Sequence, residues 1–481
     1  MNFKKLISVV AVAAIATSVF VGCSKKDETK LPATEGKKEI VNLEWVTIGT
    51  GMPANYEAWK TNINKYLGEK IGVNIDVEVV SWGDFENRKS VILNSGEAYD
   101  IMFVNSNDYV ADINLGAYKD ISELVKTDAA DLYKYIPENY WDAVKVDGKI
   151  YSVPTYKDSS MTNYFIWDKA KAEENDIDYE NINTFAQLDS ALRTLKDSEK
   201  TAPLVIDGGG IPAIYAQYDG MSAGLVPLGV RFDDSSHKVV NIFEQEDIMS
   251  QLEIMHGWYK DGIMNADAPT AKEVPAYRPF FVSQGWKTAA KTVWGPSMGV
   301  EAEAIQFGET IVTNDTVRGS LAAISAGSKN PEKALEFLQL VNLDTKVRDA
   351  FYFGLEGDNF EYVDGKVKKL KDDWSMAGYT QGTFFTVSQQ VTEEVNQWDE
   401  VKKLNESAKA SVLLGFTMDT SPVENELANC REIWNKYKAE LNTASKEPKA
   451  QVEAMTKELK AAGFDTIIET AQKQIDEQFA K

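Results

Sequence analysis

The stretch Val41-Asn42-Leu43-Glu44-Trp45-Val46-Thr47-Ile48 is rich in β-branched and aromatic residues, which predicts a largely buried β-strand. A glycine- and proline-containing loop follows at 49–53, and the apolar residues of 56–67 then recur at helical spacing. Residues 73–79 carry valine or isoleucine at every second position, which indicates a second strand. The first part of the chain is therefore predicted to run strand, loop, helix, strand.

The pattern continues with a predicted helix at 84–93 and a short buried strand at 99–104. Strands that alternate with helices in this way are typical of an α/β fold with a mostly parallel sheet. In such sheets ligands bind beyond the carboxyl ends of the strands. This rule selects two loops as candidate binding segments, Thr47–Asn55 and Asn105–Tyr109.

The N-terminus has the organisation of a secretory signal peptide. Two lysines precede an apolar run that ends at Gly22, and polar sequence follows at once. Phe20-Val21-Gly22-Cys23 resembles the lipobox of bacterial lipoproteins, which implies that Cys23 becomes the lipid-bearing first residue. We therefore expect a signal peptide at 1–22 and a lipidated, flexible tether at 23–40.

Charge and cysteine content restrict the partners. The formal net charge of −23 disfavours nucleic acid and anionic lipid surfaces as partners. Because Cys23 is assigned to lipid, the second cysteine, Cys430, has no internal disulfide partner and is expected to be a buried, inert thiol on a helix. No second hydrophobic run is long enough to span a membrane, so the lipid is the one expected anchor.

Enzyme signatures are largely missing. The chain has two histidines and no metal-type cluster around them, and no Gly-x-Ser-x-Gly element is present. Asp207-Gly208-Gly209-Gly210-Ile211-Pro212 lacks the lysine of a phosphate loop, and we interpret it as a turn near a cleft. We therefore predict no catalytic residue, metal or cofactor. A glycosidase needs only two carboxylates, so among 74 acidic residues a surface enzyme acting on glycan stays open as an alternative.

Several blocks in a fixed order carry a resemblance to a known family. They are Val80–Met102, Gly148–Pro154, Asn183–Leu188, Met264–Asp267 with Phe281–Pro296, and Ala323–Leu338. From about residue 41 onward the chain resembles the carbohydrate-type, maltose-binding-protein-like class (family 1) of ABC-transporter solute-binding proteins. In the last block, Asn330 suits a helix N-cap and Pro331 the first helical position.

The C-terminal part carries a second resemblance. Phe416–Glu426 is similar to a C-terminal domain of unknown function found in a Gram-positive subgroup of these lipoproteins. Within it, Ser421-Pro422-Val423-Glu424 has the pattern of a capping box and predicts a helix start.

The resemblance implies a type II periplasmic-binding-protein-like fold, with two lobes joined by a hinge and a mostly parallel, helix-flanked sheet in each. Lobe one would hold 41–154 and about 298–345. Lobe two would hold 155–297 and about 346–481, including a helical region at about 375–481. Closure of the lobes would trap a ligand between them.

Sugar sites combine aromatic rings with amide and carboxylate groups, and position in the chain selects the candidates. The predicted ligand-binding residues are Met52, Asn55, Asn105, Ser106, Asn107, Tyr109, Tyr156, Lys157, Asp158, Trp286, Trp294, Tyr379 and Phe384. Of these, Asn107, Tyr156 and Trp294 are predicted to lie near one cleft. Trp258 lies in a helical pattern and is assigned to the core.

The resulting functional hypothesis is an extracellular, palmitate-bearing lipoprotein of a Gram-positive-type cell. It would capture a carbohydrate, an oligosaccharide, and deliver it to the permease subunits of an ABC importer at the outer face of the cell membrane. A monomer is expected. Two alternatives stay open: capture of another solute, such as a peptide or an aromatic glycoside, by the same fold, and the surface glycan enzyme.

Overall fold

The computed structural model describes residues 40–106 and 108–479. The predicted signal peptide, Cys23, most of the tether and Asn107 lie outside the described residues. Within the described part of the chain, no helix combines the length and the apolar composition that a membrane span requires.

The first sheet has five strands in the order β2-β1-β3-β13-β6. β1 (Val41–Gly49) runs parallel to β2 (Val73–Ser81) and to β3 (Ile101–Val104), as the opening pattern predicted. β13 (Leu321–Ile324) is antiparallel to β3 and to β6 (Ser152–Pro154). The sheet is therefore mixed, and its parallel part is the N-terminal one.

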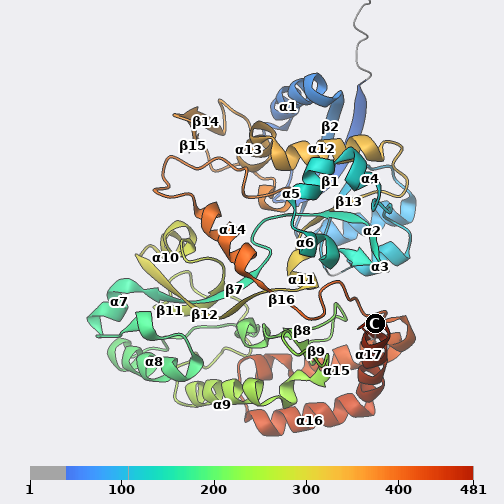
Figure 1. Ribbon diagram of the computed structural model, residues 1–481. Helices are drawn as coiled ribbons and strands as arrows, with labels where there is room; N and C mark the ends of the chain where they lie inside the picture. The colour runs from blue at the N-terminus through green and yellow to red at the C-terminus, as the bar shows by residue number, and fades with distance from the viewer. Residues whose placement is uncertain (1–39, 107, 480–481) are drawn as a thin grey trace, which may run out of the picture. The chain divides into compact units, whose positions relative to one another are not determined.

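Helix α1 (Tyr56–Ile71) forms between β1 and β2 because one of its faces is apolar (Figure 1). Its buried residues recur every three or four positions, which places them on one stripe: Tyr56, Trp59, Ile63 and Leu67. Against the same sheet lie α12 (Pro331–Leu343) and α13 (Thr345–Phe353), which contact α1. The ring of Trp45 on β1 packs against Phe337 and Phe351 of these two helices.

Shorter helices and a hairpin complete the part of the structure around the first sheet. They are α2 (Phe85–Ser95), α3 (Tyr109–Asn114), α4 (Leu124–Asp128), α5 (Ala130–Tyr135), α6 (Glu138–Ala143) and the hairpin of β4 (Lys145–Val146) and β5 (Lys149–Ile150). Gly49, at the end of β1, bridges to Met376, and a Cβ at this glycine would lie 2.2 Å from the carbonyl oxygen of Ser375. The close approach of these two backbones therefore requires glycine.

The second sheet has the order β11-β7-β12-β16. Its members are β7 (Met161–Asp168), β11 (Phe280–Gln284), β12 (Ala302–Val312) and β16 (Lys409–Ala410). β7 is antiparallel to β11 and to β12, and only β12 and β16 are parallel. The α/β class is confirmed, but the prediction of a mostly parallel second sheet is wrong. β11 and β12 follow β7 in the chain only after long connections, and both run antiparallel to it. Antiparallel neighbours need no crossover helix between them.

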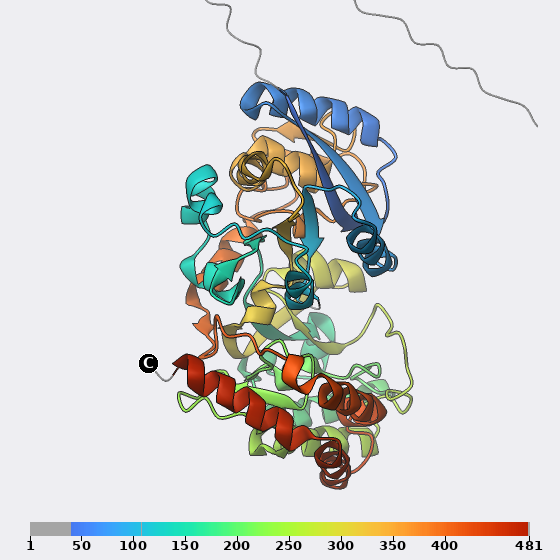
Figure 2. The ribbon, with the colours of Figure 1, turned by 90° about the vertical axis from the view of Figure 1, so that its right-hand side faces the viewer.

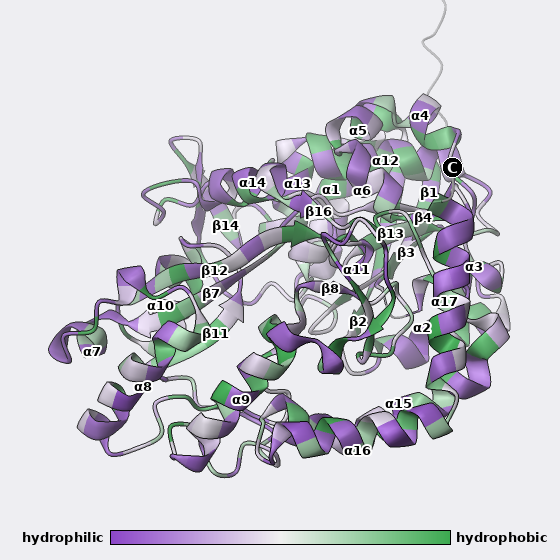
Figure 3. Cartoon of the chain, turned by 60° about the horizontal axis from the view of Figure 1, so that its bottom comes forward, coloured by the Kyte–Doolittle hydropathy of each residue, from purple (hydrophilic) through white to green (hydrophobic). Residues whose placement is uncertain are grey.

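Helices pack around the second sheet, and the last of them form a C-terminal group. They are α7 (Lys169–Glu174), α8 (Phe185–Glu199), α9 (Glu246–Lys260), α10 (Gly295–Met298), α11 (Asn314–Val317), α14 (Gln397–Ser407), α15 (Glu424–Asn442), α16 (Pro448–Ala461) and α17 (Phe464–Phe479). The C-terminal helices, red in Figure 2, lie beside the green segment that includes α9, and α16 contacts α9. Figure 3 shows hydrophilic and hydrophobic residues alternating along α16 and α17, as expected for helices with one buried face.

Small sheets and single turns join these elements. The sheets are β8 (Tyr218–Asp219) with β9 (Leu228–Arg231) and β10 (Val240–Asn241), and β14 (Phe360–Val363) with β15 (Lys366–Lys369). The 3-10 turns include Pro212–Tyr215, Gly378–Thr380 and Ser421–Val423, and a π turn spans Ala290–Trp294.

The structure has two large hydrophobic cores, one packed on each of the two main sheets. The residues of these cores divide the chain differently from the two lobes expected from sequence. β12 was expected in the first lobe, but it pairs with β7 of the second sheet. Conversely, Val347 and Phe351 of α13, together with Met376, pack in the core of the first sheet. The C-terminal helices add Leu427 and many other residues to the core of the second sheet.

Local helix signals were partly correct. α12 begins at Pro331 as predicted, although the side chain of Asn330 makes no capping hydrogen bond. The capping box predicted at Ser421 is wrong, because Ser421–Val423 forms a 3-10 turn and the hydroxyl of Ser421 donates to Asp419 instead. Trp258 is fully buried, as assigned.

Candidate ligand-binding site

A cavity of about 840 Å³ lies against the second sheet. Its walls come from residues 157–163, residues 211–228, Ile242, the end of β11, and residues 311–319. The glycine-rich segment that precedes Ile211 was predicted to be a turn near a cleft, and both Ile211 and Pro212 line this cavity. The size is that of a small-molecule site.

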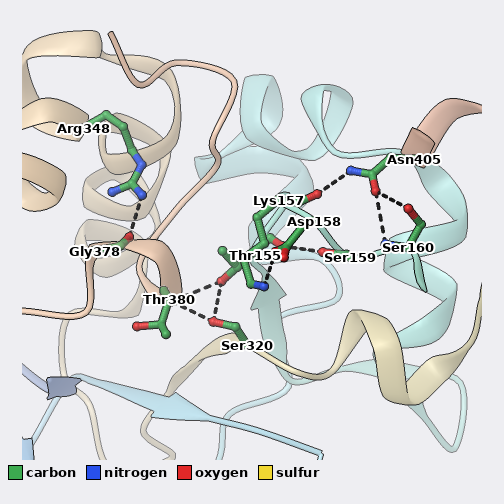
Figure 4. A network of polar contacts seen from close by, with 10 residues as sticks. All are labelled: Thr155, Lys157, Asp158, Ser159, Ser160, Ser320, Arg348, Gly378, Thr380 and Asn405. Carbon is green, nitrogen blue, oxygen red and sulfur yellow. Dashed lines mark hydrogen bonds and ion pairs between the residues drawn. The ribbon is translucent and has the colours of Figure 1, made fainter. Parts of the chain in front are cut away.

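The chain passes between the two sheets at 155–160, 313–320 and 378–408, and hydrogen bonds tie these three segments together (Figure 4). The hydroxyl of Thr155 lies 3.1 Å from that of Ser320, and both hydroxyls donate to the carbonyl oxygen of Thr380. Arg348, fully buried, donates to the carbonyl oxygens of Gly378 and Thr383. The crossing segments therefore meet at one polar junction.

Asn405 of α14 completes this junction. Its carbonyl oxygen accepts hydrogen bonds from the backbone N–H and the hydroxyl of Ser160, at 3.1 and 2.9 Å, and its amide donates to the carbonyl oxygen of Lys157. One buried side chain thus holds the third crossing segment against the first.

Lys157 and Asp158 project from the first crossing segment and line the cavity. The Nζ of Lys157 lies 2.5 Å from Oδ1 of Asp158, so the two charges form an ion pair within the wall. Both residues were among the predicted ligand contacts, and the structure places both at the cavity.

Two more carboxylates line the same cavity, those of Asp219 and Asp315. Asp315 accepts a hydrogen bond of 2.6 Å from the hydroxyl of Ser222. Asp219 is 2% exposed, and burial raises the pKa of its carboxyl group. Met221 and Ser222, which follow it, both have left-handed backbone with φ of 57° and 55°. Such backbone strain in two successive non-glycine residues is typical of a functional loop.

A pair of exposed aromatic rings lies at the carboxyl edge of the first sheet. Trp82 directly follows β2, and Tyr379 lies in the 3-10 turn Gly378–Thr380. Their rings are inclined by 13° with centroids 6.4 Å apart, and the side chains are 49% and 45% exposed. Met52, which is also exposed, follows β1, and its sulfur accepts a hydrogen bond from the backbone N–H of Val79.

The ring pair and the cavity are linked through the junction. Tyr379 precedes Thr380, whose carbonyl oxygen accepts a hydrogen bond of 2.8 Å from Ser320. Ser320 in turn follows Gly319, which lines the cavity. Of the predicted residues, Lys157 and Asp158 therefore line the cavity, and Met52 and Tyr379 are exposed beside the first sheet.

Three predicted contacts are core residues instead. Tyr109 is fully buried, and its hydroxyl donates to the carbonyl oxygen of Val144. Tyr156 is 3% exposed and packs edge-on against three aromatic rings, and burial raises its pKa to about 12. Phe384 packs on Trp398 in a separate aromatic cluster. Tyr109 and Tyr156 were selected by position after a strand and Phe384 by its place in a glycine-containing loop, and neither criterion states which way a side chain points.

Other predicted contacts serve the scaffold. The amide of Asn55 donates to Asp358 and Asn359, which fixes the first loop to a distant segment. Trp286 donates to Gln397 and packs against Trp398. Trp294 lies beside Tyr164 and Phe281 in a small cluster on the second sheet.

The remaining predicted residues follow β3. Asn105 and Ser106 are half-buried there, and Asn107 lies outside the described residues. The grouping of Asn107, Tyr156 and Trp294 around one cleft does not describe this structure, because Tyr156 belongs to the first core and Trp294 packs on the second sheet.

Sequence reasoning missed Trp82, Asp219 and Asp315. The signal for Trp82 was present, since it follows a predicted strand at the sheet edge where ligands bind. Asp219 lies in the two-residue strand β8 and Asp315 in the single-turn helix α11, and only tertiary packing sets the neighbours of these short elements. Among the described residues, no group of histidine, cysteine and carboxylate side chains is arranged to hold a metal ion.

Comparison with known proteins identifies relatives of the whole chain. The family model described as bacterial extracellular solute-binding protein matches residues 49–345, and a domain of unknown function (DUF3502) matches residues 412–480. A carbohydrate ABC transporter substrate-binding protein of Streptococcus pneumoniae serotype 4 is 29% identical over 502 aligned positions, covering 99% of this chain and 98% of the relative.

Solved structures agree with these matches. The crystal structure of the N-glycan transport solute binding protein NgtS from Streptococcus pneumoniae superposes with a TM-score of 0.84 at 26% identity, covering 92% of this chain and 100% of the other. The complex of the same protein with Man5GlcNAc gives a TM-score of 0.71 at 26% identity, over 92% and 99% of the two chains.

Proposed function

This chain belongs to the bacterial extracellular solute-binding protein family, and from that premise we propose that it captures an oligosaccharide for an ABC importer. The observation that carries the proposal is the cavity of about 840 Å³ joined through the crossing segments to the exposed ring pair of Trp82 and Tyr379. Sugars present apolar C–H faces and hydroxyl rims, which match aromatic rings on one side and polar side chains on the other.

The relatives support a carbohydrate ligand. The 29% identical relative is named as a carbohydrate substrate-binding protein, and the structural relative is an N-glycan transport protein whose complex holds Man5GlcNAc. We extend this ligand class to the present chain. The matched family and these relatives are solute-binding proteins rather than enzymes.

The proposed mechanism is closure of two lobes about the crossing segments. Lobe one would contain the first sheet with 313–377, and lobe two the second sheet with the C-terminal helices. The division replaces the one expected from sequence, and it follows the two cores. Closure would bring the ring pair over the cavity, with hydrogen bonds at the junction serving as the hinge.

We assign the ligand contacts accordingly. Trp82 and Tyr379 would supply the platform, with Met52 at its border. Lys157, Asp158, Asp219 and Asp315 would contact the hydroxyl groups of the sugar, as charged and hydrogen-bonding groups do in sites of this size. Asn105 and Ser106 remain candidates for the border of the same site, since they follow β3.

The N-terminal sequence supports a lipid anchor. We propose that residues 1–22 are removed as a signal peptide, and that Cys23 carries the palmitate-containing lipid on the outer face of a Gram-positive-type membrane. The protein would act as a monomer that delivers its ligand to membrane permease subunits.

The test is a thermal-shift screen with oligosaccharides, peptides and aromatic glycosides. A ligand that binds only the folded protein raises the melting temperature by mass action. Mannose- and N-acetylglucosamine-containing oligosaccharides are expected to raise it, whereas peptides are not. A shift with peptides alone would overturn the carbohydrate assignment. Release of reducing sugar from bound glycan would instead support the enzyme alternative.

A further inference from the structure

On the basis of the proposed carbohydrate function, we further propose that this cavity selects uncharged oligosaccharides and excludes glycans that carry a carboxylate. The argument concerns the charged groups of the wall. Three of the described lining residues are acidic, Asp158, Asp219 and Asp315, and the basic one among them is Lys157.

The ammonium group of Lys157 is already paired with the carboxylate of Asp158. Its Nζ lies 2.5 Å from Oδ1 of Asp158, and the two side chains are only 19% and 29% exposed. A ligand carboxylate that approached Lys157 would have to displace Asp158 or share the ammonium group with it. The pair therefore offers an anion little net attraction.

Two arginines behind the wall are already hydrogen-bonded to the protein. Arg431 donates to the carbonyl oxygens of Ala223 and of Gly224, which lines the cavity. Arg318 is fully buried, and its guanidinium donates to the carbonyl oxygens of Ala143 and Lys145 and to the hydroxyls of Ser222 and Thr417. Arg318 thus uses its guanidinium to hold the crossing segment 313–320 against Ala143, Lys145, Ser222 and Thr417.

Asp219 provides an acceptor that is only partly satisfied. It is 2% exposed, its Oδ1 accepts a hydrogen bond of 2.9 Å from the N–H of Met221, and the hydroxyl of Ser411 interacts with its carboxylate, whereas its Oδ2 makes no hydrogen bond of regular geometry among the described residues. A sugar hydroxyl or the N–H of an acetamido group can donate to that oxygen. A ligand carboxylate cannot, and it would lose its hydration there without gaining a cation.

The charge of the whole chain acts in the same direction. With a formal net charge of −23, the protein repels an approaching anion before contact, and this effect weakens as ionic strength rises. Discrimination at the cavity itself should persist in salt, because partly buried charges are screened less.

The experiment compares one glycan in two charge states. Man5GlcNAc and the same glycan oxidised at a single C6 position, where a carboxylate replaces the hydroxymethyl group, are titrated calorimetrically at pH 7 and 0.15 M salt. The neutral glycan is expected to bind at least about tenfold more tightly than the oxidised one. Equal affinities would overturn the inference while leaving the carbohydrate function intact. Binding of neither glycan would overturn the proposed ligand class, and the inference with it.

Asp158→Asn tests the cavity directly, because it frees the ammonium group of Lys157. In this variant the oxidised glycan should gain at least about threefold in affinity relative to the neutral one. Asp197→Asn is the control: it removes one negative charge from an exposed position of α8, and it should leave the ratio unchanged. The same gain in both variants would assign the effect to the overall charge and contradict the role of the cavity. Asp315→Asn, with the same expected direction, provides a second test if Asp158→Asn is poorly folded.

Discussion

The rings of Trp82 and Tyr379 lie nearly parallel, inclined by 13°, although Trp82 follows β2 and Tyr379 lies in the turn that begins the third crossing segment. Trp82 also rests edge-on against the buried ring of Phe103 on β3. The first sheet therefore fixes the position of this exposed pair. Two exposed rings held in this way on a rigid support are well suited to bind the apolar face of a ligand.

Replacing Trp82 by alanine should weaken oligosaccharide binding about tenfold, because the variant loses the ring on which the sugar would stack. Stability should change little, since about half of the side chain is exposed. Calorimetric titration measures the affinity. Leu115→Ala, which truncates an 81% exposed side chain elsewhere on the first lobe, is the control and should bind normally. Normal binding by both Trp82→Ala and Tyr379→Ala would disprove the platform.

Tyr156→Ala should lower the free energy of unfolding by about 3 kcal/mol, because it empties a site between the rings of Tyr135, Tyr140 and Phe385. Urea unfolding followed by fluorescence gives the value. Tyr156→Phe keeps the ring and should cost less than about 1 kcal/mol. A variant that kept its stability but lost ligand would show that the ring contacts ligand after all.

Asn405→Ala should loosen the junction between the crossing segments, because Ser160 and the carbonyl oxygen of Lys157 lose their partner. We expect a loss of about 1–3 kcal/mol in stability. Small-angle scattering should show a larger radius of gyration without ligand and the parent value with saturating ligand. An unchanged radius in the ligand-free variant would argue against a hinge at this junction.

Burial raises the pKa of the Cys430 thiol to about 11, from an ordinary value of 9.0. The folded thiol keeps its proton to higher pH than the unfolded one, so its contribution to stability is complete below pH 9 and is lost as the pH rises toward 11. Cys430→Ala removes this contribution. Its stability should therefore fall less steeply than that of the parent over this range, by at most about 1.4 kcal/mol per pH unit. Parallel slopes for the two proteins, measured by urea unfolding, would contradict the shift.

Cys23→Ala should release the protein from the membrane fraction into the medium, because the proposed lipid attachment site is lost. Fractionation of the expressing cells with immunodetection measures the distribution. Val21→Ala, which leaves the cysteine in place, serves as the control and should stay with the membrane. Retention of Cys23→Ala in washed membranes would count against the lipid anchor.

Much of the fold could be predicted because its signals are local. The alternation of 73–79 and the helical spacing of 56–67 each depend on neighbouring residues, and both elements formed as expected. The partner strands could not be predicted in the same way. β12 joins the second sheet through pairing with β7, and its own sequence contains nothing that selects β7 over another strand.

The site was predicted less well, for a related reason. Position after a strand correctly brought Lys157 and Asp158 to the cavity, but the same rule selected Tyr156, whose ring points into the core. Residues 155–160 lie outside the strands and bend at Lys157 and Asp158, so the alternation of a strand does not decide which side chains face the cavity. Packing against Tyr140 and Phe385 holds the ring of Tyr156 in the core.

The order of strands in the first sheet bears on how the protein is made. β3 lies between β1 and β13, and β13 is completed only at Ile324. Until the chain has been synthesised to that residue, one edge of β3 has no partner and is open to pairing with another chain. The N-terminal lobe is therefore expected to finish folding late, after most of the second lobe has emerged. Truncated products that end before Ile324 should aggregate rather than accumulate as a folded half-protein.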